Sequence, residues 1–504
     1  MERQKNTSRF SAKKLFNRGE LTYNDFKFLN TIYSSINYED IDLSVNLGKN
    51  IILKIPIIAS PMDKVTNAKF CVAIANQGGI GCIHMNYKNP DGSFNIDAQI
   101  SEITKVKRHE NGFIEDPITL KETNTIDDAI KIGEQNEFGI NIDTFPVIDE
   151  KNKLVGLLRK QDYSRSIHTN MKVSQRMIPV DKLIMGSYGI TLEKANKILW
   201  DNHLLFLPII DKNKMLKGLV TRSDIDKNEK YPLTTKDKNK RLRVLFAVDT
   251  KPEYAYDRLK KGFDAGADGV IIDTSQGFAK YEKEIIKYIR KNYGDVYIIG
   301  GNVSTKEGFT ALHKWGVDAI RVGQGSGSIC TTIQVLGTGR SSASGVYECS
   351  NISNKINSKT KSIADGGISY TGDILKAIGI GADAVMLGSM FAGTEESPGE
   401  IEYDEITNTQ YKKYRGMGSK SAIKNNASRG YNRAPQGVEG RVPFRGPLEN
   451  VIGEYKDALT LGLKIHNCRN FYELREKVKK GTIQFAKNDS PSSSTEMGAT
   501  IRQK

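Results

Sequence analysis

The chain has 504 residues, of which 38% are hydrophobic, and it carries a formal net charge of +15 at pH 7. This length predicts two or more domains. We find no secretory signal, and no apolar run approaches the roughly 20 residues of a bilayer span, so we predict a cytoplasmic protein without a membrane partner. The lysines are spread along the chain without interleaved aromatic residues, which disfavours nucleic-acid binding. The five cysteines lack CxxC spacing, which disfavours a disulfide framework and a zinc site.

Short β-branched apolar runs alternate with helical stretches over much of the chain. The runs include IILKIPIIAS (51–60), VYIIGGNV (296–303) and TKSIADGGI (360–368), and the helical stretches include 281–294 and 371–382. Continuous apolar runs are typical of parallel strands buried on both faces, and their alternation with helices is typical of α/β proteins. We therefore predict an α/β fold. The repetition of a strand followed by a glycine-bearing loop is consistent with a (β/α)8 barrel whose chemistry lies on the loops after the strands, and a doubly wound sheet remains the alternative.

An internal repeat interrupts this alternation. FPVIDEKNKLVGLLRKQD (145–162) matches LPIIDKNKMLKGLVTRSD (207–224) at a constant offset of 62 residues. The repeat resembles a tandem CBS pair, or Bateman module, which would cover residues 114–228. The resemblance implies a regulatory purine nucleotide whose ribose is held by Thr221 and Asp224. The first copy has Arg159 at the position of the hydroxyl residue, and a packing module without a ligand remains the alternative.

Residues 318–332, DAIRVGQGSGSICTT, combine a glycine-rich loop with a cysteine. Gly323, Gly325 and Gly327 let a ligand approach the backbone closely, because glycine has no Cβ. Cys330 follows on the same loop, where an exposed thiol among free backbone amides can act as a nucleophile. These residues alone leave two interpretations open, a structural turn and a nucleophilic site.

The pattern GxGSxCxT in this loop resembles the active-site loop of the IMP dehydrogenase and GMP reductase family. Further motifs of that family occur in the family's order: SPMDKVT (60–66), DTSQG (273–277), GGNV (300–303), ADGGI (364–368), MLGSMFAGTEESPGE (386–400) and YRGMGS (414–419). The resemblance covers almost the whole chain and implies a TIM barrel with a CBS pair inserted after the second strand. The expected domains are the first part of the barrel (1–113), the CBS pair (114–228), the rest of the barrel with a flap (229–486) and a flexible tail (487–504).

The resemblance also implies the chemistry. The thiolate of Cys330 would attack C2 of a purine nucleoside monophosphate and leave a covalent thioimidate after hydride transfer. In an IMP dehydrogenase the hydride goes to NAD and water then releases XMP. In a GMP reductase ammonia leaves GMP first, and NADPH then supplies the hydride.

Individual residues receive roles from the same motifs. The implied catalytic residues are Cys330, Thr332, Arg429, Tyr431 and Glu396. Those implied for binding the purine nucleotide are Ser60, Met62, Asn302, Arg321, Ser328, Asp365, Gly367, Gly388, Ser389, Tyr414, Gly416, Met417, Gly418 and Gln436. Those implied for the dinucleotide are Asp273, Ser275, Gly323 and Gly325.

A monovalent cation, K+, is implied beside the same loop. The backbone carbonyls of Gly325, Gly327 and Cys330 would hold it, together with Glu496 and Gly498 from a neighbouring subunit. The residue between those two departs from the family's glycine. The resemblance implies a homotetramer or a stacked octamer.

The sequence departs most from the family in the flap, KSAIKNNASRGYNRAPQGVEGRVPFRG (420–446). IMP dehydrogenases use an adjacent Arg–Tyr pair there to activate water, whereas here Gly430 separates Arg429 from Tyr431 and the flap is short. These features favour a GMP reductase. The CBS-like repeat, TEESPGE, QGVEGRVP and the cation-like tail favour an IMP dehydrogenase, which we predict. GMP reductase is the alternative, and a catalytically silent, nucleotide-sensing scaffold is the second alternative.

Overall fold

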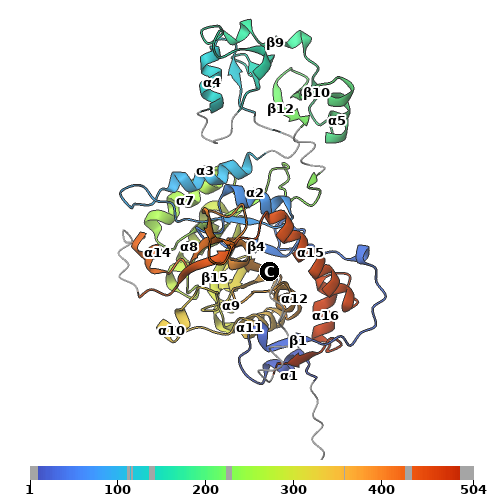
Figure 1. Ribbon diagram of the computed structural model, residues 1–504, viewed down its shortest axis with the longest axis vertical. Coiled ribbons are helices and arrows are strands. Elements are labelled where there is room, and N and C mark those ends of the chain that lie inside the picture. Colours follow the sequence, from blue (N-terminus) through green and yellow to red (C-terminus); the bar gives the residue numbers. More distant parts are fainter. Residues whose placement is uncertain are drawn as a thin grey trace, which may run out of the picture. The chain divides into compact units, whose positions relative to one another are not determined.

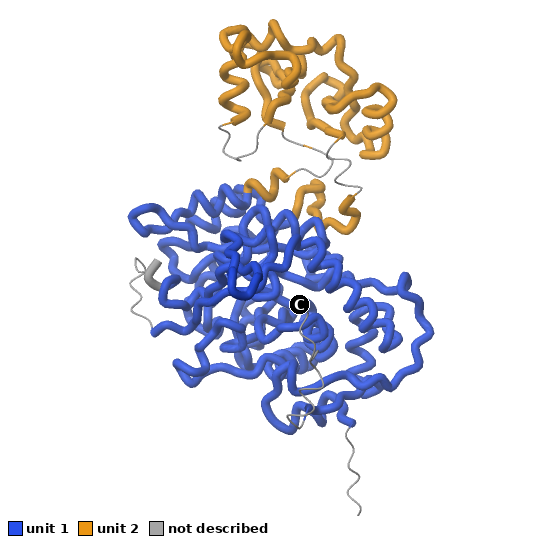
Figure 2. The backbone as a smooth tube through the Cα atoms, viewed as in Figure 1, with its two compact units in different colours: residues 1–103, 243–504 blue, residues 104–242 orange. Residues whose placement is uncertain are grey.

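The computed structural model describes residues 9–109, 114, 117–134, 142–222, 230–356, 358–425 and 434–488. The chain divides into two compact units, one formed by residues 1–103 and 243–504 and the other by residues 104–242 (Figure 2). Each unit has its own sheets and its own buried apolar residues. Within these described ranges, no helix is long and apolar enough to cross a membrane.

An eight-stranded parallel sheet forms the centre of the first unit (Figure 1). Its strands are β4 (Ile57–Ala59), β5 (Gly81–Ile83), β13 (Val244–Val248), β14 (Gly269–Ile272), β15 (Tyr297–Val303), β16 (Ala319–Val322), β17 (Lys361–Asp365) and β18 (Ala384–Leu387). They follow the order β4-β18-β17-β16-β15-β14-β13-β5. The two outer strands are joined, because the Ala59 N–H donates to the Ile80 carbonyl at 2.9 Å. The sheet therefore closes into the predicted (β/α)8 barrel.

Helices follow the barrel strands and cover them on the outside (Figure 1). They are α2 (Ala68–Asn76), α7 (Pro252–Asp264), α8 (Lys280–Tyr293), α9 (Lys306–Trp315), α11 (Ser342–Lys355), α12 (Thr371–Gly379), α15 (Leu448–Ile465) and α16 (Phe471–Lys479), while α3 (Ile96–Lys107) contains the boundary between the units. In α8 the side chains of Ile285, Ile286 and Ile289 share one face and are buried. An apolar stripe of this spacing packs a helix onto a core.

Short elements complete the first unit. They are α1 (Ala12–Phe16), β1 (Phe26–Phe28) paired with β22 (Phe485–Lys487), β2 (Val45–Asn46) paired with β3 (Ile52–Leu53), α10 (Thr332–Leu336), α13 (Ser389–Ala392), α14 (Lys420–Asn425), and the antiparallel sheet of β19 (Ile401–Asp404), β20 (Thr409–Arg415) and β21 (Glu439–Pro443). The pairing of β1 with β22 brings the two ends of the described chain together.

Both copies of the internal repeat form the same hairpin in the second unit. The first copy forms β7 (Phe145–Ile148) and β8 (Leu154–Leu158), and the second forms β11 (Phe206–Ile210) and β12 (Leu216–Thr221). The register of each hairpin shifts at the equivalent position, and the equivalent turn residues Asn152 (φ 60°) and Lys214 (φ 62°) both adopt the left-handed conformation. The two turns also contact each other through a bridge between Lys153 and Met215. The sequence repeat is therefore also a structural repeat.

Each hairpin has its own small core. The first hairpin packs on α4 (Ile126–Glu134) and belongs to the sheet of β6 (Leu120–Lys121), β7, β8 and β9 (Ile178–Pro179). The second packs on α5 (Leu192–Asp201) and forms a sheet with β10 (Gly186–Ser187). These two clusters of buried apolar residues allow the unit to hold its shape through its own contacts.

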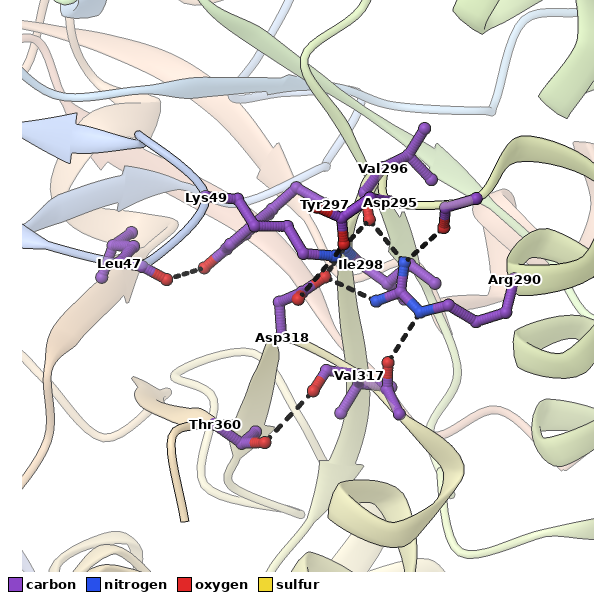
Figure 3. Close-up of polar contacts among 12 residues, drawn as sticks. Leu47, Lys49, Arg290, Asp295, Val296, Tyr297, Ile298, Val317, Asp318 and Thr360 are labelled. Atoms are coloured by element: carbon purple, nitrogen blue, oxygen red, sulfur yellow. Dashed lines mark hydrogen bonds and ion pairs between the residues drawn. The ribbon is translucent and has the colours of Figure 1, made fainter.

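A polar network ties together the amino-terminal ends of β15 and β16 (Figure 3). Asp318 lies directly before β16 and accepts hydrogen bonds from Arg290 Nη2 at 2.7 Å and from the Ile298 N–H at 2.8 Å. Lys49 forms an ion pair with the same carboxylate at 2.8 Å. Arg290 also donates to the carbonyl of Val296, which joins α8 to this end of the barrel. Asp318 therefore fixes the end of the barrel opposite the carboxyl ends of the strands.

Replacing Asp318 with alanine should lower the free energy of unfolding by about 2–3 kcal/mol, because Arg290 and Lys49 lose a charged acceptor in a half-buried position. The matched control is Asp295→Ala, since Asp295 also contacts Lys49 but its side chain is 91% exposed. The control should change stability by less than about 0.5 kcal/mol. Denaturant unfolding followed by circular dichroism measures both variants. Equal losses would contradict the assigned role of Asp318.

Candidate active site

The side chains singled out in the sequence converge on the carboxyl ends of the barrel strands. Ser60 follows β4, Asp273 follows β14, Asn302 lies near the end of β15, Arg321 lies in β16, Asp365 ends β17 and Gly388 follows β18. In a closed parallel barrel these ends lie at the same mouth, where barrel enzymes carry their active sites. Residues far apart in the sequence are thus brought to one place.

Arg321 forms the centre of this mouth. Its side chain is 8% exposed, and its guanidinium donates to Asp273 Oδ1 at 2.7 Å and to Asp365 Oδ2 at 2.8 Å. Burial lowers the pKa of Arg321, but the carboxylates of Asp365 and Asp273 outweigh it, so the net shift is upward and the guanidinium stays charged. The ion triad joins the ends of β14, β16 and β17.

Asp365 is also held by Asn302, whose Nδ2 donates to Asp365 Oδ2 at 2.7 Å and to the Gly323 carbonyl at 2.8 Å. Within the described residues, every hydrogen bond to the Asp365 side chain uses Oδ2. The other oxygen, Oδ1, is therefore left to accept from a ligand hydroxyl. The Oδ1 atom of Asn302 is buried without a partner among the described residues, which gives the mouth a second acceptor.

Cys330 lies on the loop between β16 and α10 and is partly exposed. Its Sγ lies 3.0 Å from Thr332 Oγ1, which donates to Gln436 Oε1 at 3.1 Å. A hydroxyl has one proton and can accept from a second donor. Thr332 is thus placed to exchange a proton with the Cys330 thiol while Gln436 orients its hydroxyl.

Backbone hydrogen bonds hold this loop against two of the predicted substrate motifs. The Val438 N–H donates to the Ile329 carbonyl at 3.0 Å, and the Gly416 N–H donates to the Val438 carbonyl at 3.1 Å. The Gln436 N–H donates to the Gly418 carbonyl at 3.0 Å. Three segments consequently lie side by side, namely residues 416–418, 436–438 and 329–330. This places Met417 next to the cysteine loop, the loop between β16 and α10 that carries Cys330.

A second group of predicted residues gathers around Gly388. A Cβ atom on Gly388 would lie 3.1 Å from Tyr414 Oη, 3.2 Å from Met62 Sδ and 3.8 Å from Ser60 Cβ. Burial raises the pKa of Tyr414, and a hydrogen bond with the Ser328 side chain opposes this shift. Ser389 begins α13 directly after this glycine. Only glycine leaves this space open between Ser60, Met62 and Tyr414.

Other predicted residues are placed less directly. Gly367 adopts a left-handed conformation (φ 76°), and the Ser275 carbonyl accepts from Gln324 Nε2 at 3.0 Å. Glu396 does not join the cysteine loop; its carboxylate accepts from the Leu448 N–H at 2.8 Å, at the start of α15. Thr221 ends β12 in the second unit. Arg429, Tyr431, Glu496, Gly498 and Asp224 lie outside the described residues.

The carbonyls proposed to hold a cation are partly engaged. Gly323 (φ 152°) and Gly325 (φ 80°) have backbones that favour glycine, and the Gly327 carbonyl accepts from the Cys330 N–H at 3.0 Å. A carbonyl oxygen has two lone pairs, so one remains at Gly327 for a cation. In the described part of the chain no group of three or more His, Cys, Asp or Glu side chains could hold a metal ion.

Two acidic residues near the mouth, Asp63 and Glu282, were not found from the sequence. Asp63 pairs with Arg415 and accepts from Asn86 Nδ2 at 2.8 Å, which links SPMDKVT to YRGMGS. Glu282 lies buried against Thr274 and Gly301. A signal for Glu282 was present, because it shares the face of Ile285, Ile286 and Ile289 at helical spacing.

The chain resembles proteins of known activity along nearly its whole length. A family profile described as "IMP dehydrogenase / GMP reductase domain" matches residues 20–491. Inosine-5'-monophosphate dehydrogenase of Aquifex aeolicus is 39% identical over 475 residues, 92% of this chain and 93% of that protein. The Bacillus subtilis enzyme of the same name is 37% identical over 473 residues, with the same coverage. A GMP reductase structure from Trypanosoma brucei, in complex with guanosine 5'-monophosphate, is 29% identical, with a TM-score of 0.84, and covers 96% of this chain and 98% of that one.

Iodoacetamide should label Cys330 first. The other four cysteines are buried, and burial raises the pKa values of Cys71, Cys82, Cys349 and Cys468, the last to about 11. Peptide mass spectrometry after brief treatment of the native protein at about pH 8 measures the site of labelling. The Cys330→Ala variant should stay essentially unlabelled under the same conditions. Early labelling of a buried cysteine would contradict the described packing.

Proposed function

The chain belongs to the IMP dehydrogenase / GMP reductase family, and we propose that it oxidises IMP to XMP with NAD as hydride acceptor, through a covalent bond to Cys330. Enzymes of this family are oxidoreductases that act on purine nucleotides, and so is this chain. The observation that carries the proposal is the Cys330 thiol, partly exposed beside Thr332 at the mouth that also holds Asp365.

The nucleotide would lie across the mouth of the barrel. The free Oδ1 of Asp365 suits a ribose hydroxyl, and Asn302 Oδ1 provides a further acceptor. Gly366 and Gly367 have φ values of 87° and 76°, and because glycine has no Cβ their backbone amides are open to close approach by a phosphate. Ser328, Gly388 and Ser389 complete the proposed phosphate cradle.

The proposed reaction begins with the Cys330 thiolate, whose sulfur forms a bond to C2 of IMP. Hydride would leave C2 with its electron pair, and NAD, when bound on the Asp273 side of the mouth, would supply the nicotinamide that accepts it. The nucleotide is then held on Cys330 as a thioimidate. Water adds to C2, the C–S bond breaks, and XMP leaves while the thiol is restored. Thr332 exchanges the thiol proton, since its hydroxyl lies 3.0 Å from Sγ.

The dinucleotide would bind on the Asp273 side of the mouth. Asp273 Oδ1 is held by Arg321, and the Asp273 side chain is 20% exposed, so the carboxylate is both fixed and accessible to a ribose hydroxyl. Gln324 donates to the Ser275 carbonyl at 3.0 Å and to Gln276 Oε1 at 3.0 Å, which fixes the loop that carries Asp273. These residues fit a nicotinamide ribose.

The similar proteins and the flap sequence point to different directions of the reaction. The curated relatives at 36–39% identity carry the name of the dehydrogenase, which supports IMP oxidation. The separation of Arg429 from Tyr431 by Gly430, together with the 29% identical GMP reductase structure, supports the alternative, in which GMP loses ammonia and NADPH is oxidised. Both reactions share the Cys330 adduct. We assign the dehydrogenase because its relatives are more similar in sequence.

The near-ultraviolet absorbance of reduced nicotinamide separates the two activities. Purified protein with K+ should produce NADH from IMP and NAD, and should leave NADPH unchanged in the presence of GMP. Oxidation of NADPH with GMP alone would instead assign the reductase.

The same assay without K+ tests the proposed cation at the carbonyls of Gly325, Gly327 and Cys330, and turnover should fall when K+ is replaced by a larger organic cation.

Replacing Cys330 with alanine should remove turnover while IMP still binds with an affinity within about threefold of the original, because the ribose and phosphate contacts remain. Calorimetry measures IMP binding and the absorbance assay measures turnover. The matched control is Cys349→Ala, a buried cysteine on α11 outside the mouth. Turnover by Cys330→Ala would refute covalent catalysis.

We also propose that the second unit is a CBS pair that binds a purine nucleotide in its second copy and thereby regulates the enzyme. We further propose that the enzyme is a homotetramer. In the first copy Arg159 donates to both oxygens of Asp162, at 3.0 Å and 2.8 Å, so that carboxylate is already occupied. In the second copy a threonine, Thr221, stands at the position of Arg159.

Asp224→Ala should weaken ATP or GTP binding at least tenfold, because a carboxylate that accepts from ribose hydroxyls is worth about 1.5–3 kcal/mol. Asp162→Ala is the matched control and should leave the affinity unchanged. Calorimetry with each nucleotide provides the measurement. Equal effects of both substitutions, or no nucleotide binding by the unaltered protein, would contradict the proposal.

A further inference from the structure

Glu282 is a buried carboxyl group that the reaction described above does not use. It lies in the first turn of α8 and is fully buried, on the same face as Ile285, Ile286 and Ile289. Charged side chains are almost never fully buried without a partner of opposite charge. The charged groups that act on its carboxyl are Asp273 at the end of β14 and Arg321 on β16.

Two glycines make room for this carboxyl. A Cβ on Gly300 would lie 2.9 Å from Glu282 Oε1, and a Cβ on Gly277 would lie 3.0 Å from Glu282 Oε2 and 2.7 Å from the Cα of Gly301. The same space beside Gly300 is bordered by apolar carbons of Val317 and Leu312, at 3.1 Å and 3.2 Å. The carboxyl therefore fills a narrow space between the backbone of two strand ends and apolar side chains.

The contacts around Glu282 are all satisfied as hydrogen bonds only when the carboxyl itself carries a proton. The Gly301 N–H donates to Glu282 Oε1 at 2.6 Å. Thr274 Oγ1 lies 2.9 Å from Glu282 Oε2 and also 2.9 Å from the Gly301 carbonyl oxygen. A threonine hydroxyl donates only one proton, so it cannot donate to both acceptors at once. Both contacts are satisfied when Glu282 Oε2–H donates to Thr274 and Thr274 donates to the Gly301 carbonyl.

We propose that Glu282 is a neutral carboxylic acid at neutral pH and that, in this form, it is a positioning residue that joins the Asp273 loop to the strand carrying Asn302. Thr274 follows Asp273 and Gly301 precedes Asn302 in the chain. The two segments are also linked directly, because the Asn302 N–H donates to the Thr274 carbonyl at 3.0 Å and the Gly277 N–H donates to the Asn302 carbonyl at 2.8 Å. Glu282 thus supports both the dinucleotide side and the purine side of the site.

The electrostatic environment agrees with this arrangement. The pKa of Glu282 is raised to about 8, chiefly by burial and to a smaller extent by the nearby Asp273 carboxylate. The Gly301 N–H, the Thr274 hydroxyl and the Arg321 charge act in the opposite direction without cancelling it. Ionisation would remove the donor to Thr274, release the Gly301 carbonyl and place a second negative charge near Asp273.

Turnover therefore depends on the proton of Glu282, and this part of the inference rests on the proposed function. Between pH 7 and pH 9 the neutral fraction of a group with this pKa falls about tenfold, and kcat/KM should fall with it. The Glu282→Gln variant should keep near-normal activity at pH 7 and lose this alkaline decrease, because an amide donates and accepts at the same two positions but does not ionise. Glu284→Gln, an exposed change on the same helix, should behave like the unaltered enzyme.

Two outcomes would overturn the inference. One is an identical alkaline decrease in the unaltered enzyme and in Glu282→Gln. The other is a loss of activity at pH 7 in Glu282→Gln as large as that in Glu282→Ala, which would mean that the negative charge is required.

Thermal unfolding tests the proton independently of activity. Because the folded protein binds the Glu282 proton more tightly than the unfolded chain, its stability should fall as pH rises from the ordinary glutamate range, about 4.5, to about 8. Glu282→Gln lacks this loss, so its melting temperature should rise relative to the unaltered protein through that window and then level off. A difference in melting temperature between the two proteins that stays constant through this pH window would refute the proposal that Glu282 is neutral. Absence of turnover with a pH-dependent difference would instead refute the proposed function alone.

Discussion

The buried Arg321 guanidinium is the constraint on which the active site depends. An isolated buried charge is strongly unfavourable, and breaking a buried pair costs about 3–5 kcal/mol, so the fold must keep Asp273 and Asp365 in place beside it. These two carboxylates follow different barrel strands and are the groups proposed to hold the two ribose rings. One cation thus fixes the spacing between a purine nucleotide and a dinucleotide, and Asn302 and Glu282 extend the same polar network to β15 and α8.

The reactive loop is organised differently, through its backbone. Residues 329–331 bond to residues 436–438, which in turn bond to residues 416–418, so that Cys330 is positioned by main-chain hydrogen bonds while its thiol remains partly exposed. This division suits a covalent mechanism. The ion network holds the parts of the ligands that do not react, and the loop presents the sulfur to the reacting carbon.

The unbroken apolar runs of the buried strands predicted an α/β fold, and the family motifs predicted the barrel. The match at an offset of 62 residues predicted a repeated module, and the structure shows that each copy forms the same hairpin. The sequence also assigned Asp273, Arg321 and Asp365 to the site individually. It could not show that Arg321 bonds both carboxylates, because those pairs are 48 and 44 residues apart in the chain and meet only through the tertiary fold. Glu282 was missed although it lies on an apolar helical face. The Glu396 carboxylate accepts from the backbone at the start of α15, and its catalytic role stays a prediction.

The most direct test of the account is to stop the reaction with acid during turnover of IMP and NAD and to measure the masses of the resulting peptides. We expect a purine nucleotide bound to the peptide that contains Cys330, and this adduct should disappear once IMP is exhausted. An enzyme that turns over IMP with no nucleotide on this peptide, or with the nucleotide on another residue, would contradict the assignment of Cys330 as the nucleophile.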